Sequence, residues 1–252
     1  MQQSLGFAHF LAQADGVARA ILVIMLLMSL TTWYLIIAKS LRNILIRRES
    51  ARFLKEFWQA RDLDAVARGL AAAPPQEPFG LLLQRGLRAI EQHRTRGATR
   101  LAESGGADEY LTRALRRAID EAAARAESGL TVLASVGSSA PFIGLFGTVW
   151  GIYHALIAIG LSGQGTLDKV AGPVGEALIM TALGLAVAIP AVLAYNAFTR
   201  HNRVVAAELD GFAHDVYAFM STGHRDENGG QAGDRQAAGA ARQVPAAATK
   251  GA

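Results

Sequence analysis

Three side chains in the apolar part of the sequence have the chemistry to bind or pass a proton. Thr148 lies within residues 128–167, where no Asp, Glu, Lys or Arg occurs, and Thr181 lies within a second uncharged run, 177–199. Glu176 directly precedes that second run. A hydroxyl or carboxylate at membrane depth is costly unless it meets water or a polar partner, so such residues mark candidate ion pathways. The candidate site is therefore Thr148, Thr181 and Glu176.

The two hydroxyls are expected at different depths. Counted from the outer ends of their helices, Thr148 lies roughly 18 Å deep and Thr181 roughly 10 Å deep, about 8 Å apart, so water or a proton acceptor would bridge them. Glu176 lies about 140° around the helix from Thr181 and is expected at the outer rim. His154 is interpreted as a hydrogen-bonded interface residue. Because no side chain here is an obvious proton carrier at mid-membrane depth, the sequence predicts that another chain supplies a carboxylate.

Other chemistry has little support in the sequence. Phosphate-loop, dinucleotide-binding, zinc-protease and serine-hydrolase motifs are absent. The chain has no cysteine, and its six histidines never fall at metal-ligand spacing with a carboxylate. The formal net charge of +4 is modest and gives no reason to expect a nucleic-acid partner. We therefore expect neither an enzyme nor a metal or cofactor site.

The two uncharged runs predict a transmembrane hairpin. Each is longer than the roughly 20 apolar residues that cross a bilayer. The expected helices cover residues 130–160 and 174–199, joined by a periplasmic loop at 161–173. Small residues form one stripe on each helix, at matching offsets around each threonine. On the first helix the stripe is Gly144, Gly151 and Ala155, and on the second it is Ala177, Gly184 and Ala188.

Two hypotheses account for these stripes. Small residues let two helix backbones approach each other closely in lipid, so the stripes can serve packing alone. Alternatively, several copies of the hairpin surround a pore and turn the smooth faces with their threonines toward it.

A first transmembrane helix is expected at 20–38, bracketed by Arg19 and Lys39. No cleavage site for a signal peptidase follows it, so we interpret it as a membrane anchor. Basic residues crowd its C-terminal side, which by the positive-inside rule places 1–19 in the periplasm and the C-terminus in the cytoplasm.

The remaining chain is expected to be helical and cytoplasmic. Residues 39–129 form a helical domain: the first span continues, Asp62 caps a short helix that stops before Pro74, and another helix covers about 79–93. From Ala107 a single helix of some fifty residues is expected to enter the membrane without a break. Residues 200–222 continue the last span as an amphipathic helix, and 223–252 have the composition of a disordered tail.

Two stretches carry a resemblance to a known family. Residues 140–152, APFIGLFGTVWGI, and 172–196, GPVGEALIMTALGLAVAIPAVLAYN, resemble the signature helices of the ExbB/TolQ/MotA family of proton-channel proteins, most closely its ExbB branch. The turn before Glu176 reads AGPVGEAL where the family usually has APGIAEAL. The resemblance is strong over 129–196, moderate over the first span and only architectural elsewhere.

The resemblance implies an all-α integral membrane protein of the bacterial inner membrane. It implies a homo-pentameric bundle, set in membrane lipid, that encloses the transmembrane helices of ExbD, whose aspartate would be the missing carboxylate. Proton flow would drive motion passed to TonB, which energises outer-membrane import of siderophores, haem or vitamins. It assigns Thr148 and Thr181 to the pore and Glu176 to the family's third-helix glutamate. A TolQ-like envelope-maintenance subunit and a passive membrane scaffold are the alternatives.

Overall fold

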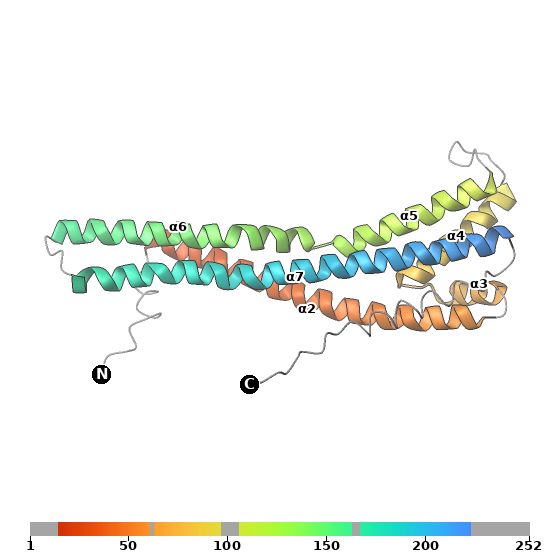
Figure 1. The fold of residues 1–252 in the computed structure, drawn as a ribbon, viewed down its shortest axis with the longest axis horizontal. Coiled ribbons are helices and arrows are strands. Elements are labelled where there is room, and N and C mark those ends of the chain that lie inside the picture. The colour runs from red at the N-terminus through yellow and green to blue at the C-terminus, as the bar shows by residue number, and fades with distance from the viewer. Residues whose placement is uncertain (1–14, 61–62, 97–105, 163–166, 223–252) are drawn as a thin grey trace, which may run out of the picture. The chain divides into compact units, whose positions relative to one another are not determined.

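The computed structural model describes residues 15–60, 63–96, 106–162 and 167–222, and every regular element among them is a helix. The expected periplasmic segment before Asp15, the Asp62 cap and the tail from Gly223 lie outside the described residues. The helices, shown in Figure 1, are α2 (Gly16–Gln59), α3 (Leu63–Ala72), α4 (Pro78–Arg96), α5 (Ala107–Glu127), α6 (Leu130–Ser162) and α7 (Leu167–Thr222).

Three stretches of the described chain are long and apolar enough to cross a membrane: Gly16–Gln59, Asp108–Leu161 and Val174–Met220. The prediction of an all-α chain with three such helices is confirmed. The first span continues without a break to Gln59, and α4 covers the helix expected near 79–93. The hairpin differs from the expectation, because α7 begins at Leu167, inside the segment 161–173 that was expected to be a loop.

The prediction of one unbroken helix from Ala107 into the membrane is wrong. α5 ends at Glu127 and α6 starts at Leu130, and between them Gly129 has a φ of +80°. Residues with a side chain rarely adopt this left-handed conformation, whereas glycine does so readily, and it is a common way to end a helix. Gly129 stands where the charged stretch meets the apolar run, and a single glycine inside a helical pattern does not by itself indicate a break.

Polar side chains from two other helices satisfy the backbone at this break. The Nζ of Lys39 donates to the carbonyl oxygens of Ala126 at 2.6 Å and Ser128 at 2.9 Å. The Nδ2 of Asn202 donates to the same Ala126 oxygen at 2.9 Å. The last carbonyls of a helix lack intrahelical donors, so Lys39 and Asn202 together cap the C-terminus of α5.

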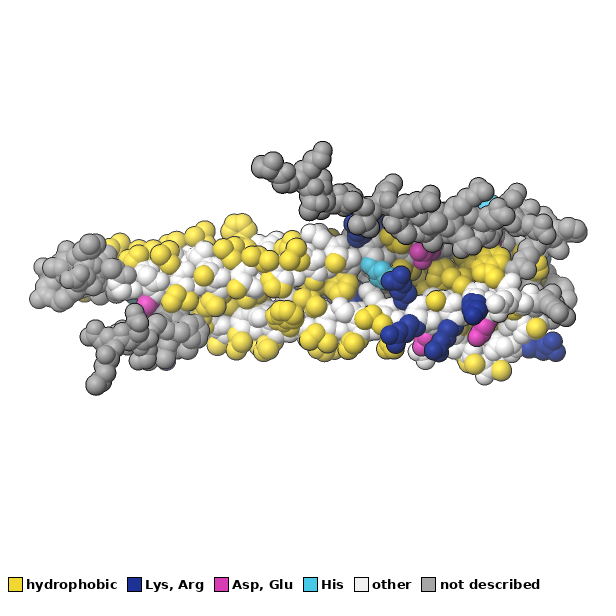
Figure 2. Space-filling view, turned by 60° about the horizontal axis from the view of Figure 1, so that its bottom comes forward, with side chains coloured by type: hydrophobic (Ala, Val, Ile, Leu, Met, Phe, Trp, Pro, Cys, Tyr) yellow, Lys and Arg dark blue, Asp and Glu magenta, His cyan; other side chains and the backbone are white. Residues whose placement is uncertain are grey.

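The chain divides into two compact units, residues 1–48 with 123–205, and 49–122 with 206–252. In the first unit, α2 packs on the α6–α7 hairpin through two apolar clusters. Their fully or nearly fully buried members include Met25 of α2, Leu133 and Ala140 of α6, and Met180 and Ala191 of α7. Large apolar side chains also cover outward faces, and Figure 2 shows hydrophobic side chains over much of the visible surface. A lipid-exposed surface has this character.

The second unit has a separate apolar core. Leu82 and Leu83 of α4 are completely buried in it, and the Phe212 ring of α7 meets Phe57 edge-on at 5.1 Å and Phe79 at 5.6 Å. Aromatic pairs in this geometry add to the stabilisation from buried area. The core thus joins α7 to α2 and α4 within this unit.

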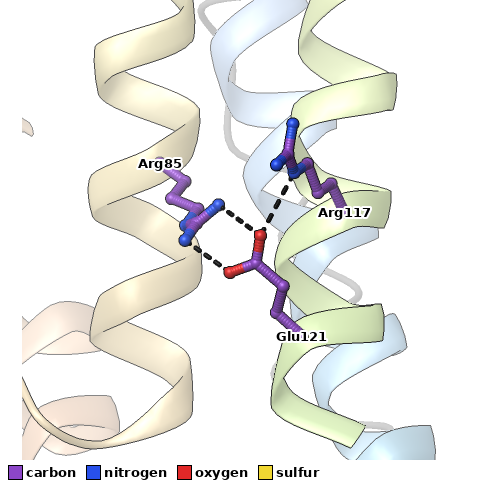
Figure 3. A network of polar contacts seen from close by, with 3 residues as sticks. All are labelled: Arg85, Arg117 and Glu121. Atoms are coloured by element: carbon purple, nitrogen blue, oxygen red, sulfur yellow. Dashed lines mark hydrogen bonds and ion pairs between the residues drawn. The ribbon is translucent and has the colours of Figure 1, made fainter. Parts of the chain in front are cut away.

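Polar contacts on the surface of this unit join α4 to α5. Arg85 makes a two-pronged ion pair with Glu121, with nitrogen-to-oxygen distances of 3.0 and 2.5 Å, and Arg117 adds a third contact at 3.1 Å (Figure 3). These side chains are partly exposed to solvent, so the network contributes little free energy compared with the apolar core.

Candidate functional site

The structure brings the two candidate hydroxyls into direct contact. The Oγ1 atoms of Thr148 on α6 and Thr181 on α7 lie 2.5 Å apart and share a hydrogen bond. The expectation of an 8 Å separation in depth is therefore wrong, and no bridging water is needed between them.

The reason is the position of the turn. α6 extends to Ser162 and α7 already begins at Leu167, so Thr148 lies fourteen residues before the end of one helix and Thr181 fourteen residues after the start of the other. In an antiparallel hairpin, equal distances from the turn mean equal depth. The expected depth of Thr181 was too small because it was counted from residue 174, whereas α7 begins seven residues earlier.

The Thr148 hydroxyl is buried among oxygen atoms. Thr148 is only 5% exposed, and its Oγ1 atom lies 3.1 Å from the carbonyl oxygens of both Gly144 and Ala177. A hydroxyl carries one proton, so it donates to one oxygen at a time. When Thr148 donates to a carbonyl, Thr181 must be the donor between the two hydroxyls. Reversing that hydrogen bond requires only that both hydroxyls rotate.

The small-residue stripes pack against each other around this pair. A Cβ atom added to Gly144 would lie 2.7 Å from the carbonyl oxygen of Met180, and one added to Gly184 would lie 2.8 Å from that of Ala140. The Cα atom of each glycine also lies 3.1 Å from the Cβ position of the other. At this crossing the backbones of α6 and α7 touch, which only glycine allows.

The stripe continues toward the turn and toward the other end of α7. A Cβ on Gly151 would lie 3.0 Å from that of Ala177, which is buried, as is Ala188; Ala155 is half-buried. Close packing therefore describes what these stripe residues do within one chain. Met180 was not singled out in the sequence, yet it is 1% exposed and its side chain fills the space beside Gly147. The G-x-x-x-G spacing of Gly147 and Gly151 signals this close approach.

Glu176 lies away from the hydroxyl pair. It is half-buried and directly precedes Ala177, about 8 Å along α7 from Thr181 at the rise of a helix. Because α7 is continuous there, the two side chains leave the helix in different directions, as the 140° offset predicts.

Two residues beyond Thr148 on α6, the structure adds a contact that the sequence did not indicate. The indole Nε1 of Trp150 donates to Oδ2 of Asp15 at 2.7 Å, and the Trp150 ring lies 4.6 Å from the exposed ring of His154. Asp15 also caps α2 by accepting the Ala18 N–H at 2.7 Å, and this bond, with that of Trp150, lowers the pKa of Asp15. His154 hydrogen bonds within its own helix, to the Trp150 carbonyl oxygen at 3.1 Å.

No metal site forms among the residues that the structure describes, since no three His, Asp or Glu side chains gather there. The geometry of the site is instead that of two helices in backbone contact around one buried pair of hydroxyls. Such a pair can accept a proton on one side and release one on the other.

Comparison with known proteins identifies the family of the chain. Residues 75–211 match the MotA/TolQ/ExbB proton channel family. The chain is 41% identical over 229 residues to the biopolymer transport protein ExbB of Xanthomonas campestris pv. campestris, covering 88% of this chain and 90% of that protein. It is 42% identical over 206 residues to ExbB of Neisseria meningitidis, covering 82% and 93%.

Proteins of the TolQ type are also similar. The chain is 36% identical over 239 residues to the Tol-Pal system protein TolQ of Haemophilus influenzae, covering 91% of this chain and 98% of that protein. Together with the three apolar helices, these matches identify a membrane transport protein. The chain therefore belongs to the MotA/TolQ/ExbB proton channel family.

Proposed function

We propose that this protein is an ExbB-like inner-membrane subunit of a TonB–ExbB–ExbD energy-transducing complex. Several copies, five by family resemblance, enclose the transmembrane helices of ExbD. Proton flow through this assembly drives motion that TonB passes to outer-membrane importers of siderophores, haem or vitamins. The N-terminus is periplasmic and the C-terminus cytoplasmic, because the basic residues flank the inner ends of the spans.

The hydroxyl pair is the observation that carries this proposal. Thr148 is buried, whereas Thr181 is only half-buried, so a carboxylate of ExbD approaching the hairpin would reach Thr181 first. The 2.5 Å contact then passes a change in hydrogen bonding to Thr148 and its carbonyl neighbours. Residues 128–167 contain no carboxylate, and the Asp15 carboxylate, which lies near the level of Thr148, is bound to the Trp150 indole and the Ala18 N–H. Among the described residues this chain therefore offers the hydroxyl pair hydrogen-bond partners but places no acid in contact with it.

Glu176 has a different role in this proposal. It lies on α7 between the hairpin turn and the hydroxyls, about 8 Å from the level of Thr181. At the outer rim a carboxylate attracts cations and can hand protons inward. It therefore serves as an entry group rather than as a partner of the hydroxyl pair.

The test replaces each hydroxyl without changing shape. Thr181→Val and Thr148→Val keep the branched side chain and remove the oxygen, while serine at either position keeps the hydroxyl. In a strain lacking the gene, ferric-siderophore uptake should be restored by wild type and by the serine variants, and should fall at least tenfold with either valine variant. Thr31→Val is the matched control, because Thr31 is exposed on α2 and its hydroxyl bonds only to the Leu27 carbonyl.

Either valine variant supporting full uptake at normal protein levels would rule out the proton path through this pair and leave a passive scaffold. The TolQ-like function remains the second candidate, because the chain is also 36% identical to TolQ of H. influenzae. It is separated on the same cultures by detergent sensitivity: deletion that leaves uptake intact but makes the envelope leaky assigns the protein to envelope maintenance.

A further inference from the structure

The outward apolar face of α2 extends beyond Lys39, the basic residue that follows the expected span. Exposed large apolar side chains begin at Val23 and continue through Leu41, Ile44 and Leu45, which are 58%, 51% and 59% exposed. The distance from Val23 to Leu45 is about 33 Å along a helix, close to the roughly 30 Å of a bilayer's hydrocarbon core. Side chains of this size on a water-facing surface would be a costly arrangement.

Lys39 does not mark the membrane boundary on this face. Its ammonium group is turned toward the end of α5, where it donates to the carbonyl oxygens of Ala126 and Ser128. It also lies 5.9 Å from the centre of the Phe198 ring of α7. A lysine with such partners can lie within the thickness of a bilayer, because its ammonium group is directed to helix-end carbonyls, which stabilise the charge by hydrogen bonds and by their dipoles.

The next three basic residues of α2 after Lys39 are Arg42, Arg47 and Arg48, and none of them has such partners in the part of the chain that the structure describes. Arg42 is exposed and lies three residues before Leu45, about 5 Å along the helix, a distance that an extended arginine side chain can cover to reach the headgroup level. Arg47 and Arg48 are exposed, and within the described residues neither makes a hydrogen bond or an ion pair. They follow directly on the apolar face that ends at Leu45. An apolar helix face ending in unpaired arginines matches the boundary between acyl chains and anionic phosphate headgroups.

We propose that the outer face of α2 meets the bilayer down to Leu45, and that Arg47 and Arg48 bind the headgroups of anionic phospholipids in the inner leaflet. The membrane boundary on this face lies about two helical turns beyond Lys39. The proposal concerns α2 alone. Asn202 shares the Ala126 oxygen with Lys39, so the exposed Arg200 and Arg203 of α7, which flank Asn202 in the sequence, lie near the level of Lys39. It does not depend on the proposed function.

The first test locates the boundary with spin labels. The chain has no cysteine, so single variants at Ile44 and Leu45 can be labelled directly and the full protein reconstituted in bilayers. Collision with dissolved oxygen reports lipid, and collision with a water-soluble nickel chelate reports solvent. Leu30→Cys, on the same face nearer the middle, is the lipid control. Arg116→Cys, exposed on the charged helix α5, is the solvent control.

We expect the labels at Ile44 and Leu45 to behave like that at Leu30, with high oxygen and low nickel accessibility. High nickel accessibility would place the boundary at Lys39 and overturn the proposal. Low accessibility to both reagents would mean that a second copy of the chain covers this face, which also overturns it.

The second test addresses the headgroup. Spin-labelled phosphatidylglycerol and phosphatidylcholine are compared for their association with the reconstituted protein. Wild type should prefer the anionic lipid, and Arg47→Gln with Arg48→Gln should reduce that preference by roughly fivefold per arginine. Arg88→Gln with Arg116→Gln removes the same charge from exposed positions of α4 and α5 and should leave the preference unchanged. If the two double variants reduce the preference equally, the preference depends only on the net charge of the protein, and the proposed headgroup site is refuted.

Discussion

At the residue scale, the absence of side chains is as important to this site as the presence of two hydroxyls. Gly144 and Gly184 bring two backbones into contact, and only at that spacing can the threonine oxygens reach 2.5 Å. The glycines thus position the chemistry although they take no part in it. The glycines lower the stability of the helices themselves, because a mid-helix glycine is less favourable than alanine by roughly 1 kcal/mol.

Alanine at Gly144 or Gly184 should therefore destabilise the hairpin by about 1–3 kcal/mol, since the added methyl would meet a backbone carbonyl that cannot rotate away. Gly147→Ala should cost less, because its new neighbour is the flexible Met180 side chain. Thermal unfolding in detergent measures these differences. Gly211→Ala is the control: nothing lies within 4 Å of its Cβ position, so it should be neutral or stabilising. Equal effects at all four positions would contradict the packing account.

A second residue-scale effect concerns Glu77, which is 4% exposed. Burial raises its pKa above the usual value, although it accepts hydrogen bonds from the Phe79 and Gly80 N–H groups and from Ser50. Because the folded-state pKa is the higher one, Glu77 contributes stability when protonated, and this contribution is lost as the pH rises through the folded-state pKa.

Glu77→Gln removes the charge and keeps an acceptor for one of the two N–H groups, which donate to different oxygens of the carboxylate. Relative to this variant, wild type should gain thermal stability as the pH is lowered from 8 toward 5. If the melting temperatures of wild type and Glu77→Gln change in parallel across that range, the pKa of Glu77 is not raised in the folded protein. Glu77→Ala, which lacks the acceptor, should lose about 1 kcal/mol at every pH.

At the element scale, the break at Gly129 decides where α6 begins, and therefore which of its turns meets α7. The left-handed glycine ends α5, and Lys39 and Asn202 supply the donors that its last carbonyls need. Three helices of the first unit are fixed to one another at this point.

Gly129→Ala should cost about 1–3 kcal/mol, because a φ of +80° strains a residue with a side chain and its Cβ would lie 3.1 Å from Leu35. Gly129→Asn should be milder, since asparagine adopts this conformation more readily. Lys39→Met keeps the length of the side chain but loses both charged hydrogen bonds, at a cost of similar size. Melting temperatures in detergent test the series; an unaffected Lys39→Met would show that water caps α5 equally well.

At the scale of the whole molecule, the proposed assembly assigns different neighbours to different apolar faces. The outer face of α2 is left to lipid, whereas the exposed apolar positions of α6 and α7 must include the contacts between copies. Phe142 on α6 is 70% exposed and Leu185 on α7 46% exposed, without a covering neighbour in one chain. Their exposure is explained if another copy packs there.

Single cysteines at Phe142 and Leu185 should therefore form cross-links between copies in native membranes, singly or as a mixed pair. Cysteine at Leu27, which is 58% exposed on the lipid-facing side of α2, should not. Gel electrophoresis without reductant reads the result. Cross-linking at Leu27 but at neither of the other positions would reverse the proposed arrangement.

The sequence by itself determined the three apolar helices, the absence of charge within the hairpin and the two threonines with their glycine neighbours. These features follow from composition and helical period, which act locally and can be read along one segment. It also indicated that small residues would allow close packing.

Only the tertiary structure decided that Thr148 meets Thr181, that the chain breaks at Gly129, and that Lys39 caps α5 instead of facing the membrane surface. Each depends on which turn of one helix lies beside which turn of another. A stripe of small residues is nearly identical at successive turns, so the pattern within a single helix does not specify that register. Contacts between helices specify it, and they exist only once the chain has folded.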